Sequence, residues 1–240
     1  MLLLVELGLL FLLAMHLPKI IKEVRGANAE ALFAFPALVK EKVSAHPLVA
    51  LITAESLMFY YAFASWKRKP PVGEDKFTLH QKTSMLIFYI MLVHAIVIET
   101  VGIHWWLHGK SMILSIVLLV LNVYSVIYFI AEIQTVRLNP LAMKDDRIQI
   151  SLGLGRRMEI PYDAIERIEW FEDTEQCNLK EAGLIEFIAK DMEGKPNCIL
   201  HFRRPLQATL FMGKEKEFRT AAIRLDEPKN FRHALEKKLG

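Results

Sequence analysis

The chain has few of the residues that mark a disulfide scaffold, a structural zinc site or a nucleic-acid-binding surface. Its 240 residues include only two cysteines, Cys177 and Cys198, and their separation is not the CxxC spacing of zinc and redox motifs. The formal net charge of +3 is too small to indicate a nucleic-acid partner. We therefore expect free cytoplasmic thiols and no nucleic acid bound.

Catalytic motifs are missing as well. The sequence contains no nucleophile–base arrangement and no complete metal motif such as HExxH. It therefore identifies no reaction, and whether the protein is an enzyme stays open.

Charged residues are spread unevenly over a chain that is 53% hydrophobic. Residues 1–136 hold 11 Lys or Arg and 9 Asp or Glu, whereas residues 137–240 hold 19 and 18. This contrast predicts a membrane domain at 1–136 and a separate soluble domain at 144–240. A domain of about 100 residues is large enough for one small core.

The most apolar stretch predicts a helical hairpin. Residues 83–107 and 110–133 each supply about the 20 apolar residues that a helix needs to cross a bilayer. Both runs are continuous and lack the alternation of membrane β-strands, so helices are expected. Trp105 and Trp106 at the bend suit a turn at the membrane–water interface.

Two further spanning helices are expected, at about residues 1–21 and 47–66, which gives a bundle of four spanning helices. The first has no basic start and no cleavage site of small residues, so we expect it to be retained. The second is followed at once by the basic residues 67–69. Residues 27–39 are too short to span and contain a proline, which favours an interfacial segment.

Basic residues favour a cytoplasmic C-terminal domain. Four spans place both chain ends on one side of the membrane, and the loop at 67–82 on that side carries five Lys or Arg. The 18–46 segment, which would lie outside, also carries five, so the asymmetry rests on the charged residues after 131. We expect a multi-pass protein of the cell membrane.

The C-terminal part has the pattern of a small all-β domain. Short runs of strand-forming residues are separated by turn residues, and some alternate, as in IERIEW at 165–170. Phe231, Leu235 and Leu239 recur every four residues and predict a closing amphipathic helix at 228–239. The seven expected strands are residues 147–152, 157–160, 165–171, 183–190, 197–204, 208–212 and 218–225.

Seven strands and a closing helix is the element order of the pleckstrin-homology-like (PH-like) barrel. The stretch RIQISLGLGRRMEIPYDAIERIEW resembles the opening hairpin and third strand of bacterial PH-like domains, and DEPKNFRHALEKKL resembles their terminal helix. The resemblance covers residues 144–239. It implies interaction or scaffolding, and it supplies no catalytic residue.

Ionisable residues in the membrane part are the strongest functional signal. In an up-and-down bundle, five of them would lie near the non-cytoplasmic face. Two of the histidines are spaced i and i+4, which places them on one side of a helix, as in some metal sites. Such a layer could hold a divalent metal such as zinc, and interfacial histidines or a proton or ligand path are the alternatives. The predicted metal ligands are His16, His46, Glu99, His104 and His108.

Other polar residues have separate predicted roles. Glu55 and His94 lie within predicted spans, where an ionisable side chain is costly, and His94 is expected to form a hydrogen bond between helices. Basic residues in two predicted β turns could contact anionic headgroups, each charge contributing about 1 kcal/mol near the surface. For the second pair, which alternates with two glutamates, a solvated surface is the favoured alternative. These lipid-contact residues are Arg156, Arg157, Lys214 and Lys216.

Three classes of function remain. The preferred one is a membrane scaffold or sensor whose PH-like domain docks a protein partner or the inner leaflet. The expected partners are membrane lipid, including anionic headgroups, and either a protein partner or a second copy of the chain. The second is a small intramembrane metal-dependent enzyme that uses the polar layer. The third is a transporter or immunity-type factor, although four helices without inverted halves give a thin pore unless the protein oligomerises.

Overall fold

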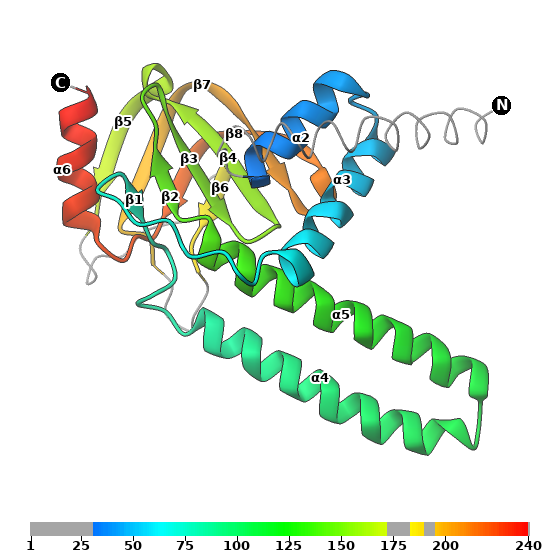
Figure 1. Cartoon of the computed structure of the whole chain (residues 1–240). Helices are drawn as coiled ribbons and strands as arrows, with labels where there is room; N and C mark the ends of the chain where they lie inside the picture. Colours follow the sequence, from blue (N-terminus) through cyan, green and yellow to red (C-terminus); the bar gives the residue numbers. More distant parts are fainter. Residues whose placement is uncertain (1–30, 172–182, 190–194, 240) are drawn as a thin grey trace.

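A long helical hairpin projects from a β domain in the computed structural model, which describes residues 31–171, 183–189 and 195–239 (Figure 1). The hairpin consists of α4 (Met85–His108) and α5 (Met112–Leu138). Beside the β domain lie α2 (Ala31–Lys42) and α3 (Pro47–Phe59), and a π-helical turn continues α3 to Ala64. The helix expected at residues 1–21 lies outside the described residues.

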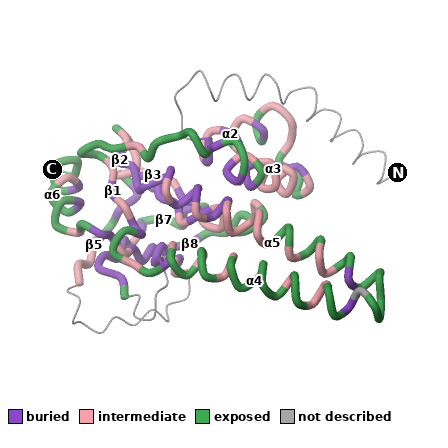
Figure 2. Tube along the Cα trace, turned by 60° about the horizontal axis from the view of Figure 1, so that its bottom comes forward, coloured by how far each residue is buried: buried purple, intermediate pink, exposed green. Residues whose placement is uncertain are grey.

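Three described helices are long and apolar enough to cross a membrane. None of the residues in the most apolar window of α4 is buried, and only 6% of those in α5 are, against 33% for α3 and its continuation. Figure 2 shows the same contrast, with the hairpin mostly exposed or intermediate and the β domain buried. The three segments are Pro47–Ala64, Met85–Leu107 and Met112–Leu138, which match the helices expected at 47–66, 83–107 and 110–133.

α3 crosses the base of the hairpin and packs along the β domain instead of running beside the hairpin (Figure 1). Near its start, the Ala50 carbonyl oxygen lies so close to Gly213 that a Cβ there would come within 2.8 Å of it. Near its end, the Tyr61 hydroxyl donates to Asn139 Oδ1 at the exit of the hairpin (3.1 Å). The described helices therefore do not form the expected up-and-down bundle.

The β domain is a curled mixed sheet, a half-barrel closed by the helix α6 (Pro228–Leu239). Its strands pair in the order β1-β2-β3-β4-β7-β8-β6, and β5 also pairs with β7. The pairs are antiparallel except for β6 and β8, which are parallel. The strands are β1 (Lys76–Phe77), β2 (Leu141–Met143), β3 (Arg147–Leu152), β4 (Arg156–Pro161), β5 (Ile165–Trp170), β6 (Leu184–Phe187), β7 (Cys198–Leu210) and β8 (Glu215–Ile223).

This sheet differs from the expected seven strands in two ways. The runs expected at 197–204 and 208–212 form one strand, β7, whose pairing with β8 shifts register between His201 and Leu206. Pro205 lies in that irregular stretch, where the missing N–H of a proline is tolerated. The sheet also gains β1 and β2, so the loop at 67–82 contributes a strand to the β domain.

α6 closes the half-barrel by inserting apolar side chains into its core. Phe231 and Leu235 are fully buried, as the four-residue spacing predicts, whereas Leu239 at the end of the helix is exposed; the helix expected at 228–239 is confirmed. The Phe231 ring packs edge-on against Phe77 of β1 (5.2 Å between ring centroids). The closing helix thus holds the N-terminal strand of the sheet in place.

A buried glutamate fixes the exit of the hairpin to the β domain. Glu132 of α5 is only 4% exposed, and its Oε1 accepts hydrogen bonds from the Tyr128 hydroxyl (2.8 Å) and the Leu154 N–H (3.1 Å). The β3–β4 turn approaches this carboxylate closely. Gly153, with φ 64°, has no room for a Cβ, which would collide with Glu132 Oε2.

A buried aspartate fixes the entry of the hairpin. Asp226, 5% exposed, follows β8 and accepts hydrogen bonds from the N–H groups of Gln81 and Lys82 (both 2.9 Å), just before α4. Its own N–H donates to the Thr78 carbonyl (3.0 Å). Since carboxylate–amide hydrogen bonds are charge-assisted, both legs of the hairpin are held firmly.

Gly153→Ala should destabilise the protein, whereas Gly155→Ala in the same turn should have little effect. A Cβ at positive φ costs about 1–2 kcal/mol. Displacing Glu132 leaves buried donors unsatisfied at a further cost of about 1–3 kcal/mol. A Cβ on Gly155 meets nothing within 4 Å. Thermal unfolding of both variants in detergent measures the difference, and equal melting temperatures would show that the Glu132 contact is unimportant.

His80 should make the stability of the hairpin entry depend on pH. Burial lowers the pKa of His80 below its ordinary value of 6.5, Asp226 opposes the shift and Arg137 adds to it. The unfolded chain therefore binds the proton more readily, so His80 contributes its full stability above pH 6.5 and loses it as the pH falls through the range below.

The melting temperature should accordingly fall on acidification, and His80→Gln should weaken that fall. His233→Gln, which alters an exposed histidine of α6, is the matched control and should leave the pH profile unchanged. Parallel profiles for wild type and His80→Gln would exclude this role for His80.

Candidate functional site

Two polar contacts join the hairpin helices. Asn122 Nδ2 donates to Thr100 Oγ1 (2.8 Å), and nearer the bend Ser115 Oγ lies 2.8 Å from His104 Nδ1. Interhelical hydrogen bonds of this kind contribute about 0.6 kcal/mol each in lipid. They fix the register of α4 against α5.

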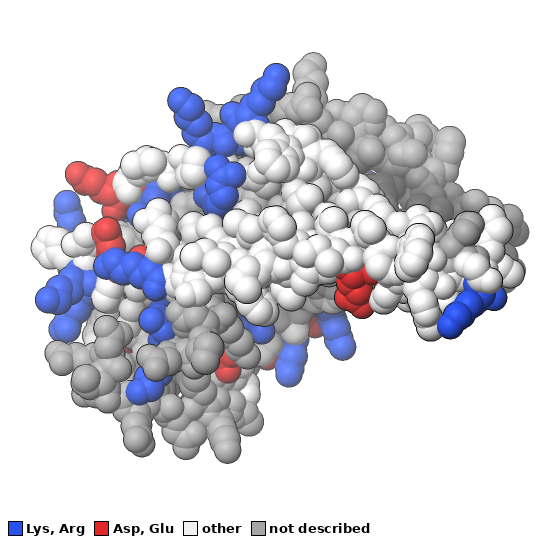
Figure 3. Space-filling view, turned by 90° about the horizontal axis from the view of Figure 1, so that it is seen from below, with Lys and Arg blue, Asp and Glu red and all other residues white. Residues whose placement is uncertain are grey.

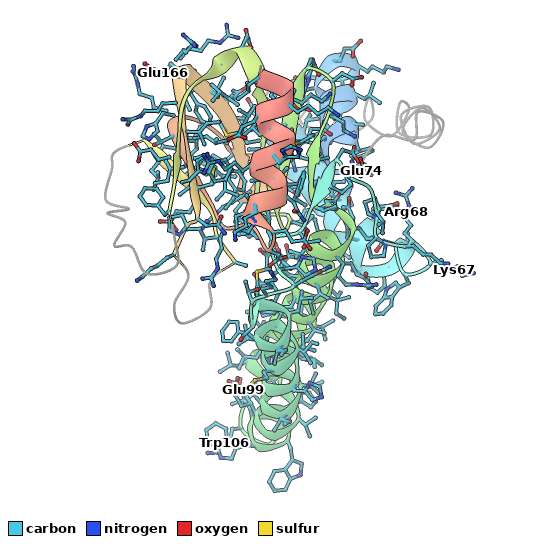
Figure 4. The ribbon with its side chains drawn as sticks, turned by 90° about the vertical axis from the view of Figure 1, so that its left-hand side faces the viewer. Lys67, Arg68, Glu74, Glu99, Trp106 and Glu166 are labelled. Carbon is cyan, nitrogen blue, oxygen red and sulfur yellow. The ribbon has the colours of Figure 1, made fainter. Side chains whose placement is uncertain are left out.

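The predicted metal ligands are not brought together among the described residues. His46 caps the N-terminus of α3 beside the β domain, where its Nδ1 accepts from the Leu48 N–H (3.3 Å). His104 lies near the bend of the hairpin, and Glu99 projects from the side of α4 (Figure 4). The reason is that α3 crosses the hairpin base, so its start is far from the bend.

No group of three or more His, Cys, Asp or Glu that could hold a metal ion occurs in the part of the chain that the structure describes. His16 lies outside the described residues. His108 ends α4. The described residues thus add no support to a zinc layer at the hairpin bend.

The two predicted intramembrane polar residues have local partners. Glu55 Oε1 accepts from the Tyr124 hydroxyl (2.8 Å), which links α3 to α5. His94 Nδ1 donates to the Ile90 carbonyl (3.0 Å) in its own helix. The hydrogen bond expected between helices at His94 is therefore replaced by one within α4, because the side chain turns back along the helix.

A cleft of about 550 Å³ lies between α2, the start of α3 and the outer face of β4 and β7. Arg157 lines it from β4 and is only 9% exposed. Side chains alternate between the two faces of a strand, so Met158 and Ile160 lie on one face of β4 and Arg157 lies on the other. Met158 and Ile160 point into the core. Arg157 points outward, where α2 and α3 cover it.

The carboxylates around the cleft are already paired. Lys40 Nζ lies 2.9 Å from Glu215 Oε1, and Arg147 Nη1 lies 3.2 Å from Glu159 Oε2. By contrast, Arg157 makes no hydrogen bond or ion pair with any residue that the structure describes. Its guanidinium brings five N–H donors to the cleft, and none of them has an acceptor among the described residues.

Burial lowers the pKa of Arg157 to about 10, against the opposing effects of Tyr61 and Glu215. The side chain is therefore charged at neutral pH. Buried charges are normally paired, because an isolated one is expensive to remove from water. A buried guanidinium that lines a cleft and has no partner in the described part of the chain indicates a site for an anion.

The four predicted lipid-contact residues have different surroundings. Arg156 points inward and its Nη1 donates to the Glu186 carbonyl (2.6 Å). Arg157 lies inside the cleft and Lys214 on its exposed rim. Lys216 is exposed, with its Nζ 5.4 Å from the centre of the Phe218 ring. Only the two lysines have the open exposure expected of surface lipid contacts.

Comparison with protein-family models, with curated proteins and with solved structures finds no match.

Arg157→Met should raise the stability of the protein in buffer without multivalent anions. Methionine keeps most of the length and apolar contact of the stem, and it removes an uncompensated charge. The expected gain in unfolding free energy is about 1–3 kcal/mol. Arg232→Met, at an exposed position of α6, is the control and should change little. A melting temperature of Arg157→Met well below that of the wild type would show that Arg157 makes a stabilising interaction beyond those seen among the described residues.

Proposed function

We propose that the protein is a membrane-anchored scaffold or sensor, in which the hairpin is the anchor and the β domain recognises a partner or ligand at the membrane surface. The observation that carries this proposal is the exposed apolar surface of α4 and α5, joined to a folded domain at both legs. Neither a transporter nor a metal-dependent enzyme gains a comparable feature from the described residues.

The hairpin has the dimensions of a bilayer anchor. α4 and α5 contain 24 and 27 residues, so at 1.5 Å per residue each is longer than the roughly 30 Å hydrocarbon core. Figure 3 shows a largely uncharged surface along the hairpin, with few coloured atoms. A contiguous apolar surface of this extent is unusual on a soluble monomer and marks membrane contact.

The distribution of basic residues supports a cytoplasmic β domain. Lys67 and Arg68 project beside the hairpin base, and Trp106 lies at the opposite, distal end (Figure 4). Lys110 is the one Lys or Arg between residues 83 and 136, so the base is far more basic than the bend. Positive charge is enriched on the cytoplasmic side of membrane proteins, and tryptophan at interfaces.

The PH-like resemblance of residues 144–239 belongs to the same proposal. A curled sheet closed by a C-terminal helix supports it, and so does the lack of any catalytic motif in the sequence. The domain then acts by docking a protein partner or the inner leaflet. Its two carboxylate-fixed connections to the hairpin make the anchor and the docking domain one unit.

Single-cysteine labelling tests the orientation. With Cys177→Ser in the background, Cys198 stays silent because it is fully buried and burial raises the pKa of its thiol. Val72→Cys, at a 97% exposed position on the base side, should react with a membrane-impermeant reagent only after permeabilisation. Lys110→Cys at the bend should react in intact cells. The opposite pattern would place the β domain outside, and release of the protein by carbonate washing would refute the anchor.

A further inference from the structure

We propose that the cleft at Arg157 is a binding site for a phosphate or phosphoester oxyanion, with Arg157 as its main ligand. This site rests on the proposed function in one respect: the β domain is the part of the protein that binds the ligand. The ligand would sit between α2–α3 and the outer face of the sheet.

The charges that face the cleft from each surrounding element leave an excess of positive charge. α2 provides Lys40 and the start of β8 provides Glu215, and these two are paired with each other at 2.9 Å. Glu159 of β4 is paired with Arg147. Arg157 and Lys214 are the remaining charged residues of the lining.

The start of α3 adds the positive end of a helix dipole to this excess of positive charge. Pro47, Val49 and Ala50 line the cleft, so the N-terminal end of a helix faces it. Helix N-termini favour anions because their first N–H groups and the helix dipole point outward. A planar guanidinium binds two oxygens of a phosphate at once, which a single-charge lysine does not do. The arrangement therefore suits a tetrahedral oxyanion better than a halide.

The cleft is large enough for more than the anion. Its volume of about 550 Å³ exceeds that of inorganic phosphate, and Phe33 and Met212 provide apolar lining. A phosphoester with an organic substituent fits this mixture. Lipid headgroups and small soluble phosphoesters share that chemistry, and they are distinguished by experiment.

Binding should be measured by thermal unfolding of the full chain in a non-ionic detergent, with sodium chloride at matched ionic strength as reference. The probes are inorganic phosphate and glycerol 3-phosphate for the soluble source. For the lipid source, the protein in phosphatidylcholine nanodiscs is compared with nanodiscs that also contain phosphatidic acid. A ligand that binds only the folded state raises the melting temperature in a concentration-dependent way.

Wild type should respond to at least one of these probes. Arg157→Met should weaken that response by at least about 30-fold in apparent affinity, since removal of a buried partner of an anion is expensive. Arg157→Lys keeps the charge without the fork and should respond weakly, whereas Arg232→Met should respond as wild type.

A response to the soluble probes assigns a soluble oxyanion, and a response confined to phosphatidic acid assigns a lipid; both support the site. Wild type that ignores every probe, or Arg157→Met that responds fully, overturns it. Because the cysteine labelling does not involve Arg157, failure of the site and failure of the membrane orientation are separate results.

Discussion

The burial of Glu132 is the constraint on which the arrangement of this protein depends. Removing a carboxylate from water is costly unless hydrogen bonds compensate for the lost hydration. This cost is offset because the β3–β4 turn supplies the Leu154 N–H and leaves space at Gly153 for the carboxylate. Together with Asp226 at the entry, this contact turns an apolar hairpin and a small sheet into one body.

Local patterns predict part of this structure well. The apolar runs at 83–107 and 110–133 determine helices by themselves, and the spacing of Phe231 and Leu235 determines the buried face of α6. What local patterns miss is set by distant contacts. β1 is a strand only because it pairs with β2, more than 60 residues later in the chain, and the direction of α3 depends on its packing against Gly213.

The candidate site could not be predicted from the sequence for the same reason. Strand alternation correctly places Arg157 on the outer face of β4, which reads as a solvated or lipid-facing charge. Its meaning changes only when α2, a short segment expected at the membrane interface, covers that face. For the histidines, the sequence predicted a site that the structure does not assemble. Placing His46 and His104 in one layer requires α3 to pack alongside the hairpin, but α3 crosses the base of the hairpin.

The position of α3 gives the cleft a physical route to the membrane anchor. An anion on Arg157 would pair the sheet with the start of α3, while Glu55 and Tyr61 on the same helix contact Tyr124 and Asn139 at the hairpin. If α3 adopts a second position, a ligand that binds one position more tightly shifts the equilibrium between the two, and by linkage a change at the hairpin base alters the ligand affinity equally. A buried arginine without a partner among the described residues is a cost in a purely structural anchor, but in the sensor that we propose it would supply the differential affinity that such coupling requires.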